Sequence, residues 1–473
     1  MKGFVLKIHA LIFFSLLCSS SMLFTNAAET YPPLAPAADD SAFGQNIQRT
    51  MTLLATSTPE HHNKVRILFY GQSITEQEWS KYVADDLRKR FPNADLDIQN
   101  RAIGGFASQI LVRIAEHDLY PFYPDLLIFH VYGANQQYEE IIANTRQRTT
   151  AEILMQKDHV TKWPPDEIDE KKDKGMWWDN MMNQKFLPGI AKKYGCGLAD
   201  VRAVWLDYLK TNKLEPKDLL KDGVHLNAHG NFLMSEIINR NLAYKPTLPN
   251  DNWKDLVRTV QVGKDVQWKE GKLTLEFEGN RVDAIAAQAA ESGQAEIRID
   301  GKKPSDFPEL YTIMRTSVSQ AGFWPSILRV THEKPLLLED WTVTITEVIE
   351  GEKSCKFKFD VSGSKTGADG SGSSEAKFVS NSGRVAIESK DWWLNNARQQ
   401  SQKKVPVGFT AHWHINPMFV DEYKPLKAED PTHEYPTTLA QGLSNEKHTL
   451  EIVQTGTTPV AIKEIRVYTP PVK

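Results

Sequence analysis

The chain of 473 residues is poor in cysteine, carries no excess of positive charge and, beyond its first residues, contains no long apolar run. Only three cysteines are present, which excludes a fold held together by many disulfides. We expect Cys196 and Cys355 to be free, buried thiols. A formal net charge of −4 does not point to a nucleic acid or an anionic membrane as partner. No later stretch reaches the roughly 20 apolar residues that a membrane span needs.

Residues 1–27 have the composition of a cleavable secretory signal. Lys2 and Lys7 precede an apolar core over residues 10–17, and a serine-rich stretch follows. A basic, then apolar, then small-residue order is typical of export signals. We therefore expect a secreted or periplasmic protein.

The remaining chain is too long for one ordinary hydrophobic core, and its apolar periodicity divides it. Residues 28–63 are expected to form an N-terminal extension with a short helix. Residues 64–244 alternate apolar strands with amphipathic helices, which predicts an α/β domain with a parallel sheet. Residues 245–262 are interpreted as a linker. Residues 263–473 change to a period of two, which predicts an all-β sandwich or jelly-roll domain.

Residues 65–75, with the sequence VRILFYGQSIT, organise the first domain. The first six form an apolar run typical of a strand buried on both faces of a parallel sheet. Thr75 and Glu78 have the spacing of a T-x-x-E capping box, so a helix is expected to begin near Glu76. Ser73 would then lie in a strand-to-helix turn, where open α/β sheets present ligand-binding groups. Ser73 is our candidate nucleophile.

Three further stretches supply groups that suit a serine nucleophile. They are NRAIGGFAS over residues 100–108, PDLLIFHVYGAN over residues 124–135 and DGVH over residues 222–225. A serine hydroxyl needs a base to accept its proton, and histidine fits this role near neutral pH. An aspartate three residues before the histidine can orient its ring. Glycine amides and an asparagine side chain can donate hydrogen bonds to an oxyanion.

In this order the four blocks resemble those of the SGNH hydrolases, the GDSL-type esterase superfamily, over about residues 64–244. The resemblance implies a flavodoxin-like, three-layer parallel sheet. It also implies a catalytic triad in which Ser73 is the nucleophile, His225 the base and Asp222 its partner. No cofactor and no metal are implied.

The resemblance further implies an oxyanion hole formed by the amides of Ser73 and Gly105 and the side chain of Asn135. Gly105 is chosen within its glycine pair because it lies five residues after Asn100, as in the family's second block. Gln72 stands where the family usually has aspartate, and we interpret this as an adjustment of the turn. Each residue keeps a structural alternative, such as a turn glycine, a loop cap or an Asx-turn.

Residues 157–178 interrupt the strand and helix alternation with prolines, charged runs and tryptophans. We hypothesise that Trp177 and Trp178 stack on a sugar and line the substrate site. The alternative is an insertion that these aromatic side chains pin to the core. Alternating strand and helix order places this loop on the side of the sheet where ligands bind.

In the second domain, the segments IRIDG, HTLEIV and IKEIRVY resemble parts of galactose-binding-like sandwich domains. The resemblance is confined to the ends of the domain. Trp392, Trp393 and Trp413 are interpreted as core residues, with polysaccharide binding as the alternative. Residues 361–374, rich in glycine and serine, are predicted to be a flexible loop. A supporting or weak glycan-binding role remains a hypothesis.

Together these observations predict a secreted serine esterase that hydrolyses carboxylic esters through an acyl-enzyme. The first choice of substrate is an acylated polysaccharide from which acetyl groups are removed. One alternative is a lipid or short-chain ester hydrolase. Another is a non-catalytic glycan-binding protein that retains the fold.

Overall fold

A computed structural model gives the fold of the chain, and from Leu34 onward it forms one compact unit. The export signal predicted for residues 1–27 lies outside the described part. None of the helices in the described part is both long and apolar enough to cross a membrane. The structure describes residues 31–165, 169–248, 256–289, 291–317, 325–351, 354–426 and 430–472.

Five parallel strands form the central sheet, in the order β2-β1-β3-β4-β5. All residues of β3 and β4 are buried, because these apolar runs lie between two layers of helices. The strand order is that of flavodoxin-like sheets, which confirms the predicted α/β fold class. The strands are β1 (Lys64–Gly71), β2 (Asp95–Asn100), β3 (Leu126–His130), β4 (Glu152–Gln156) and β5 (Gly197–Ala199).

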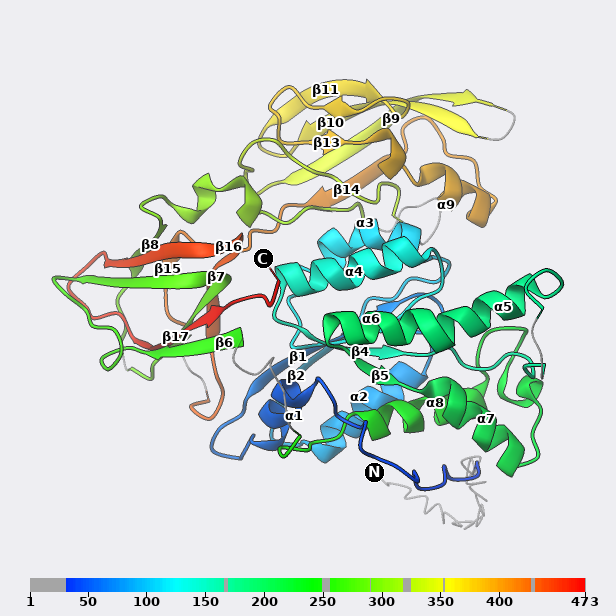
Figure 1. The fold of residues 1–473 in the computed structure, drawn as a ribbon. Helices are drawn as coiled ribbons and strands as arrows, with labels where there is room; N and C mark the ends of the chain where they lie inside the picture. Colours follow the sequence, from blue (N-terminus) through cyan, green and yellow to red (C-terminus); the bar gives the residue numbers. More distant parts are fainter. Residues whose placement is uncertain are drawn as a thin grey trace, which may run out of the picture. The chain divides into compact units, whose positions relative to one another are not determined.

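Side chains of β1 alternate between the two faces of this sheet, as extended backbone requires. Ile67 and Phe69 enter one core, whereas Leu68 and Tyr70 enter the core on the opposite face. Helices cover both faces (Figure 1). Those on the first face are α1 (Gln48–Ala55), α2 (Trp79–Arg90), α7 (Val201–Thr211) and α8 (Ala228–Asn241); those on the second are α3 (Ser108–Asp118), α4 (Asn135–Arg148) and α6 (Leu187–Tyr194).

The capping box expected after β1 is wrong. Helix α2 begins at Trp79, and its N-cap residue Glu78 makes no side-chain capping hydrogen bond. Thr75 is fully buried, and its Oγ1 donates to the carbonyl oxygen of His130 over 3.2 Å. The hydroxyl thus bonds a carbonyl at the end of β3.

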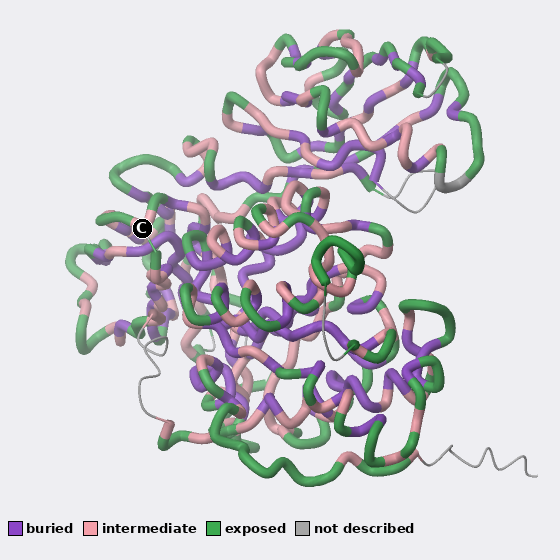
Figure 2. The backbone as a smooth tube through the Cα atoms, turned by 45° about the vertical axis from the view of Figure 1, so that its right-hand side comes forward, coloured by how far each residue is buried: buried purple, intermediate pink, exposed green. Residues whose placement is uncertain are grey.

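The C-terminal region consists mainly of β-strands, as predicted, with one short helix, α9 (Leu394–Ser401), and contains two larger antiparallel sheets with separate cores. Buried segments run along the strands of both (Figure 2). The first sheet has the order β15-β8-β16-β7-β17-β6 and the second β11-β10-β9-β14. The strands are β6 (Val257–Gln261), β7 (Lys272–Ala286), β8 (Ala295–Ile299), β15 (Glu422–Tyr423), β16 (Pro436–Gln454), β17 (Ile462–Tyr468), β9 (Asp340–Glu350), β10 (Cys355–Gly363), β11 (Gly367–Ser373) and β14 (Thr410–His414).

The prediction of a flexible loop over residues 361–374 is wrong, because most of this segment belongs to the β10–β11 hairpin. Its small residues are needed for packing. A Cβ atom at Gly372 would lie 2.6 Å from the ring of Phe378 and 2.7 Å from that of Phe359. At Gly372 the two aromatic rings leave no room for a side chain, whereas Gly367 and Gly370 have positive φ values of 79° and 117°.

Two predictions about single side chains in the core are confirmed. Cys196 and Cys355 are free and buried. Trp413 is buried and stacks on Trp341 with ring centroids 6.4 Å apart, so it belongs to the core of its sheet. The predicted boundaries at residues 244 and 263 stay predictions.

Candidate active site

The turn after β1 brings Ser73 to the carboxyl edge of the sheet. Here β1 and β3 approach so closely that a Cβ atom at Gly71 would lie 2.0 Å from the carbonyl oxygen of His130. Only glycine fits this position. The next residues form a tight turn in which the amides of Thr75 and Glu76 both donate to the carbonyl oxygen of Gln72.

The structure brings the three predicted triad residues together. The Nε2 atom of His225 lies 3.0 Å from the Oγ atom of Ser73. On the other side of the ring, the Nδ1 atom of His225 lies 2.9 Å from the Oδ2 atom of Asp222. Both distances are within hydrogen-bonding range. A proton acceptor therefore faces the serine hydroxyl, and a carboxylate fixes the ring from behind.

Asp222 uses its two oxygens for different tasks. Its Oδ1 atom accepts hydrogen bonds from the amides of Val224 and His225, each at 2.8 Å. These amides, together with the His225 side chain, lower the pKa of Asp222 to about 2. The carboxylate is therefore ionised at neutral pH and suited to stabilise an imidazolium. Asp222 therefore forms the Asx-turn of the structural alternative and also makes the contact with His225 that a triad requires.

The predicted oxyanion donors lie at the same edge of the sheet. Gly105 has a positive φ of 81°, which favours glycine, and it precedes α3. Asn135 is the first residue of α4, which follows β3. The two segments are tied together, because the hydroxyl of Ser108 donates to the carbonyl oxygen of Ala134 over 2.8 Å. Neither Gly105 nor Asn135 has a direct hydrogen bond to the triad among the described contacts.

A contact of Glu76 distinguishes the two glycines of the second block, Gly104 and Gly105. The sequence did not indicate a role for Glu76. Its Oε2 atom accepts the amide of Gly104 over 3.0 Å. A Cβ atom at Gly104 would lie 3.6 Å from that of Ser73, so this contact is beside the nucleophile. The Gly104 amide is thus occupied, which agrees with the choice of Gly105. No local pattern in the sequence indicates this contact.

Asn100 fastens the nucleophile turn to β2. Its Nδ2 atom donates to the carbonyl oxygen of Thr75 over 2.7 Å and to the hydroxyl of Ser80 over 2.9 Å. The side chain therefore holds the segment that carries Ser73 against the end of the neighbouring strand. In this structure Asn100 supports the turn and does not reach the triad.

Trp177 and Trp178 lie on α5 (Lys174–Met181), which continues through a π-helical turn into α6. Both side chains are partly exposed. Trp178 packs against the core that also contains Leu187 and Ile190. Their proposed stacking on substrate stays a prediction.

A second histidine and aspartate pair lies buried behind the site. The Nε2 atom of His130, at the end of β3, is 2.9 Å from the Oδ1 atom of Asp158. Burial opposes ionisation of Asp158, but hydrogen bonds from His130 and Asn183 hold its pKa below the usual value. Sequence analysis missed this pair, although polar residues at the carboxyl ends of parallel strands are a signal that could have indicated it.

A metal site is not evident in the part of the chain that the structure describes, where no three His, Cys, Asp or Glu side chains lie close enough to share an ion. His229, four residues after His225, has its Nε2 atom 2.7 Å from the hydroxyl of Tyr208. Ser73, His225 and Asp222, with their contacts of 3.0 and 2.9 Å, are suited to nucleophilic and acid–base chemistry.

No protein-family model and no curated protein matches this sequence. Among solved structures, the acetylxylan esterase Axe2 of Geobacillus stearothermophilus has 17% identity and a TM-score of 0.33, covering 41% of this chain and 100% of its own. A putative GDSL-like lipase of Parabacteroides merdae has 18% identity and a TM-score of 0.33, and the match covers 39% of this chain and 98% of that protein. A two-domain esterase active on acetylated mannans has 15% identity and a TM-score of 0.35, and the match covers 91% of this chain and 98% of that protein. Similarities this low carry no conclusion about activity, which rests on the geometry of the site.

Proposed function

We propose that this chain is a secreted serine esterase of the SGNH type that removes acyl groups, with acetyl as first choice, from a polysaccharide. The observation that carries the proposal is the contact chain from Ser73 through His225 to Asp222, with distances of 3.0 and 2.9 Å. Ser73 is far from His225 and Asp222 in the sequence, and their convergence at one edge of the sheet is what nucleophilic catalysis requires.

In the proposed first half-reaction, the Oγ atom of Ser73 attacks the ester carbonyl carbon while the Nε2 atom of His225 accepts its proton. Asp222 stabilises the imidazolium that forms. The amides of Ser73 and Gly105 and the side chain of Asn135 would donate to the oxyanion, each such donor being worth about 3 kcal/mol. The intermediate collapses as the alcohol leaves with the proton from His225, and an acyl-serine ester remains.

The second half-reaction repeats these steps with water. His225 accepts a proton from water, whose oxygen attacks the acyl carbon, and the carboxylic acid leaves as Ser73 regains its proton. The lowered pKa of Asp222 supports both steps, because the ionised carboxylate is present whenever the ring becomes charged. No cofactor is required for either step.

A polar cavity of about 840 Å³ lies beside the nucleophile turn, although Ser73, His225 and Asp222 are not among its lining residues. It adjoins the nucleophile turn at Glu76 and Asn100 and extends to Arg315 and Asn416 of the C-terminal region. Hydrogen-bonding side chains from both halves of the protein suit a sugar chain better than a hydrocarbon. Secretion is proposed from the basic, apolar and small-residue pattern of residues 1–27.

The experiment that tests the proposal compares the native protein with a Ser73→Ala variant. Hydrolysis of p-nitrophenyl acetate should be readily measured for the native protein and fall at least about 10³-fold in the variant. Equal rates would contradict the serine esterase. Release of acetate from acetylated polysaccharides, compared with hydrolysis of long-chain lipid esters, then separates the proposed substrate from the lipid alternative. A protein that binds glycans but hydrolyses neither would be the non-catalytic alternative.

A further inference from the structure

His225, which contacts Ser73, and Asp222, which contacts His225, belong to one short, exposed loop. Residues 221–225 project from a base formed by the bridge between Leu220 and Leu226, with the Lys221 amide donating to the carbonyl oxygen of His225 over 2.9 Å. Asp222 and Val224 are exposed. The loop contributes little apolar packing, so its position must be fixed by specific polar contacts.

Gln77 holds the base of this loop from the side of the nucleophile. Its Oε1 atom accepts the amide of Leu226 over 3.0 Å, and its Nε2 atom donates to the carbonyl oxygen of the same residue over 2.9 Å. Gln77 lies in the turn that carries Ser73, and Leu226 directly follows His225. One amide side chain therefore joins the segment of the nucleophile to the segment of the base.

His159 holds the tip of the loop from inside the protein. Its Nε2 atom lies 2.8 Å from the carbonyl oxygen of Val224, the residue directly before His225. The side chain is buried, and its ring lies against that of Trp205 with centroids 5.5 Å apart. A carbonyl oxygen only accepts hydrogen bonds, so the Nε2 atom carries the hydrogen. Burial lowers the pKa of His159 to about 4, so the ring is neutral at neutral pH.

We propose that Gln77 and His159 are positioning residues that clamp the loop of residues 221–225, so that the His225 ring stays within bonding distance of Ser73. This inference rests on the proposed esterase function. Neither residue contacts the triad side chains through its own side chain, and neither lines the polar cavity. Their effect is therefore expected in kcat, not in KM.

The clamp matters because acid–base catalysis depends steeply on geometry. A displacement of about 1 Å at a catalytic group can cost on the order of 10²-fold in rate. His225 lies 3.0 Å from the Ser73 hydroxyl, and its loop has polar contacts at both the base and the tip. Releasing either contact allows the loop to occupy positions in which the base and the hydroxyl are too far apart for proton transfer.

The test uses three variants of the full chain. His159→Phe keeps a ring beside Trp205 but removes the donor, His159→Gln restores a donor of similar reach, and Gln77→Met keeps the side-chain length without either hydrogen bond. With p-nitrophenyl acetate, kcat should fall about tenfold or more for His159→Phe and Gln77→Met, with KM unchanged. His159→Gln should recover most of the lost rate.

A matched control is His332→Gln in the C-terminal region. His332 also bonds a main-chain carbonyl oxygen, that of Lys334, through a ring nitrogen at 3.1 Å, but it is not part of the site. This variant should keep the native kcat. Thermal unfolding of every variant checks that the protein is folded. If His159→Phe does not fold, Gln77→Met decides, because Gln77 is only partly buried.

Native kcat in both His159→Phe and Gln77→Met, with Ser73→Ala inactive, would overturn the clamp and leave the esterase proposal standing. A Ser73→Ala variant as active as the native protein would overturn both. A loss of rate in His159→Phe that His159→Gln does not recover would also contradict the proposed hydrogen bond. A rise in KM without a change in kcat would assign these residues to substrate binding instead.

Discussion

Asp222 contacts both the main chain of its loop and the side chain of His225. Its Oδ1 atom accepts the amides of Val224 and His225 at 2.8 Å, and its Oδ2 atom faces the His225 ring at 2.9 Å. One carboxylate thus shapes the loop and orients the His225 ring. This local arrangement depends only on a spacing of three residues, which is why the sequence could predict it.

Asn135 allows a test of the proposed oxyanion hole. An Asn135→Ala variant should lower kcat for p-nitrophenyl acetate by about 10²–10³-fold, because one fixed donor to the oxyanion is lost. KM should change little, since the ground-state carbonyl carries less charge. The control is Gln136→Ala, which removes an exposed amide from the next position of α4. Native kcat in Asn135→Ala would exclude this side chain from the oxyanion hole.

Other residues near the site could not be predicted, because their partners are distant in the sequence. Gln77 bonds Leu226, and His159 bonds the carbonyl oxygen of Val224. Glu76 bonds the amide of Gly104. None of these contacts joins residues at a sequence spacing that is typical of a known motif. Only the topology of the parallel sheet, which brings the segments after β1, β2, β4 and β5 together, explains why they meet.

At the scale of elements, hydrophobic periodicity predicted the strands and helices but not the turn chemistry. Thr75 and Glu78 have the spacing of a capping box, yet Thr75 bonds a carbonyl of β3 instead. A tertiary contact has overridden a local preference. Likewise, the glycines of β11 suggest flexibility from composition alone, whereas Gly372 lies between two aromatic rings.

Gly372 provides a test of this packing. A Gly372→Ala variant places a methyl group where Phe378 and Phe359 already lie within 2.7 Å, so it should lower the free energy of unfolding by about 1–3 kcal/mol. Urea denaturation measures the change. Gly456→Ala is the control, because no atom lies within 4 Å of its added Cβ. Equal stability of the two variants would contradict the packing explanation.

Two histidines shielded from water, the half-buried His117 and the buried His159, make stability depend on pH. Burial lowers the pKa of His117, on α3, from 6.5 to about 4. Between these values the unfolded chain binds a proton that the folded protein does not, so stability falls as the pH drops from 6.5 to 4. The contribution is at most about 3 kcal/mol. His159 acts in the same sense, whereas Glu152, with a pKa raised by burial to about 7, acts in the opposite sense.

A His117→Gln variant isolates this contribution. The midpoint of urea denaturation should fall less between pH 7 and pH 4.5 in the variant than in the native protein, because glutamine cannot bind the proton. The two proteins are compared in the same buffers. Parallel pH profiles would show that His117 is protonated equally in the folded and unfolded states.

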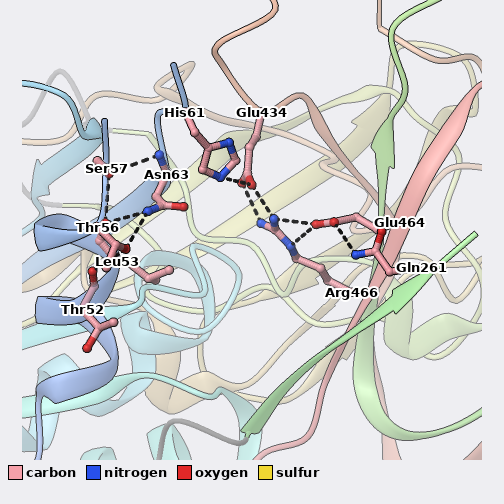
Figure 3. A network of polar contacts seen from close by, with 10 residues as sticks. All are labelled: Thr52, Leu53, Thr56, Ser57, His61, Asn63, Gln261, Glu434, Glu464 and Arg466. Atoms are coloured by element: carbon pink, nitrogen blue, oxygen red, sulfur yellow. Dashed lines mark hydrogen bonds and ion pairs between the residues drawn. The ribbon is translucent and has the colours of Figure 1, made fainter. Parts of the chain in front are cut away.

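At the scale of the whole molecule, polar contacts join the α/β and β regions within one compact unit. Arg315 bonds Asp118 of α3 over 3.0 Å. Near the start of β1, a network centres on Arg466 of β17, which bonds Glu434 and Glu464, while His61 lies 3.5 Å from Glu434 (Figure 3). Such pairs depend on the final fold, so a sequence pattern cannot indicate them.

Substitution of Arg466 measures how much this network contributes to the free energy of unfolding. An Arg466→Met variant leaves Glu434 and Glu464, which are 6% and 7% exposed, without their main cation. Stability should fall by about 3–5 kcal/mol, because uncompensated buried carboxylates are costly. The control Arg298→Met, which breaks an exposed pair with Glu296, should cost less than about 1 kcal/mol. Equal losses in the two variants, measured by urea denaturation, would contradict this assignment.

The proposed function depends on activation of the Ser73 hydroxyl by His225, so that the oxygen attacks an electrophile. The most direct test is to treat the protein with a fluorophosphonate and map the modified residue by peptide mass spectrometry. We expect one phosphonyl group per chain, attached to Ser73, and a reaction much slower after Asp222→Asn substitution because the base is no longer held and stabilised. A fully folded protein that remains unmodified at Ser73, or is modified at another serine instead, would contradict it.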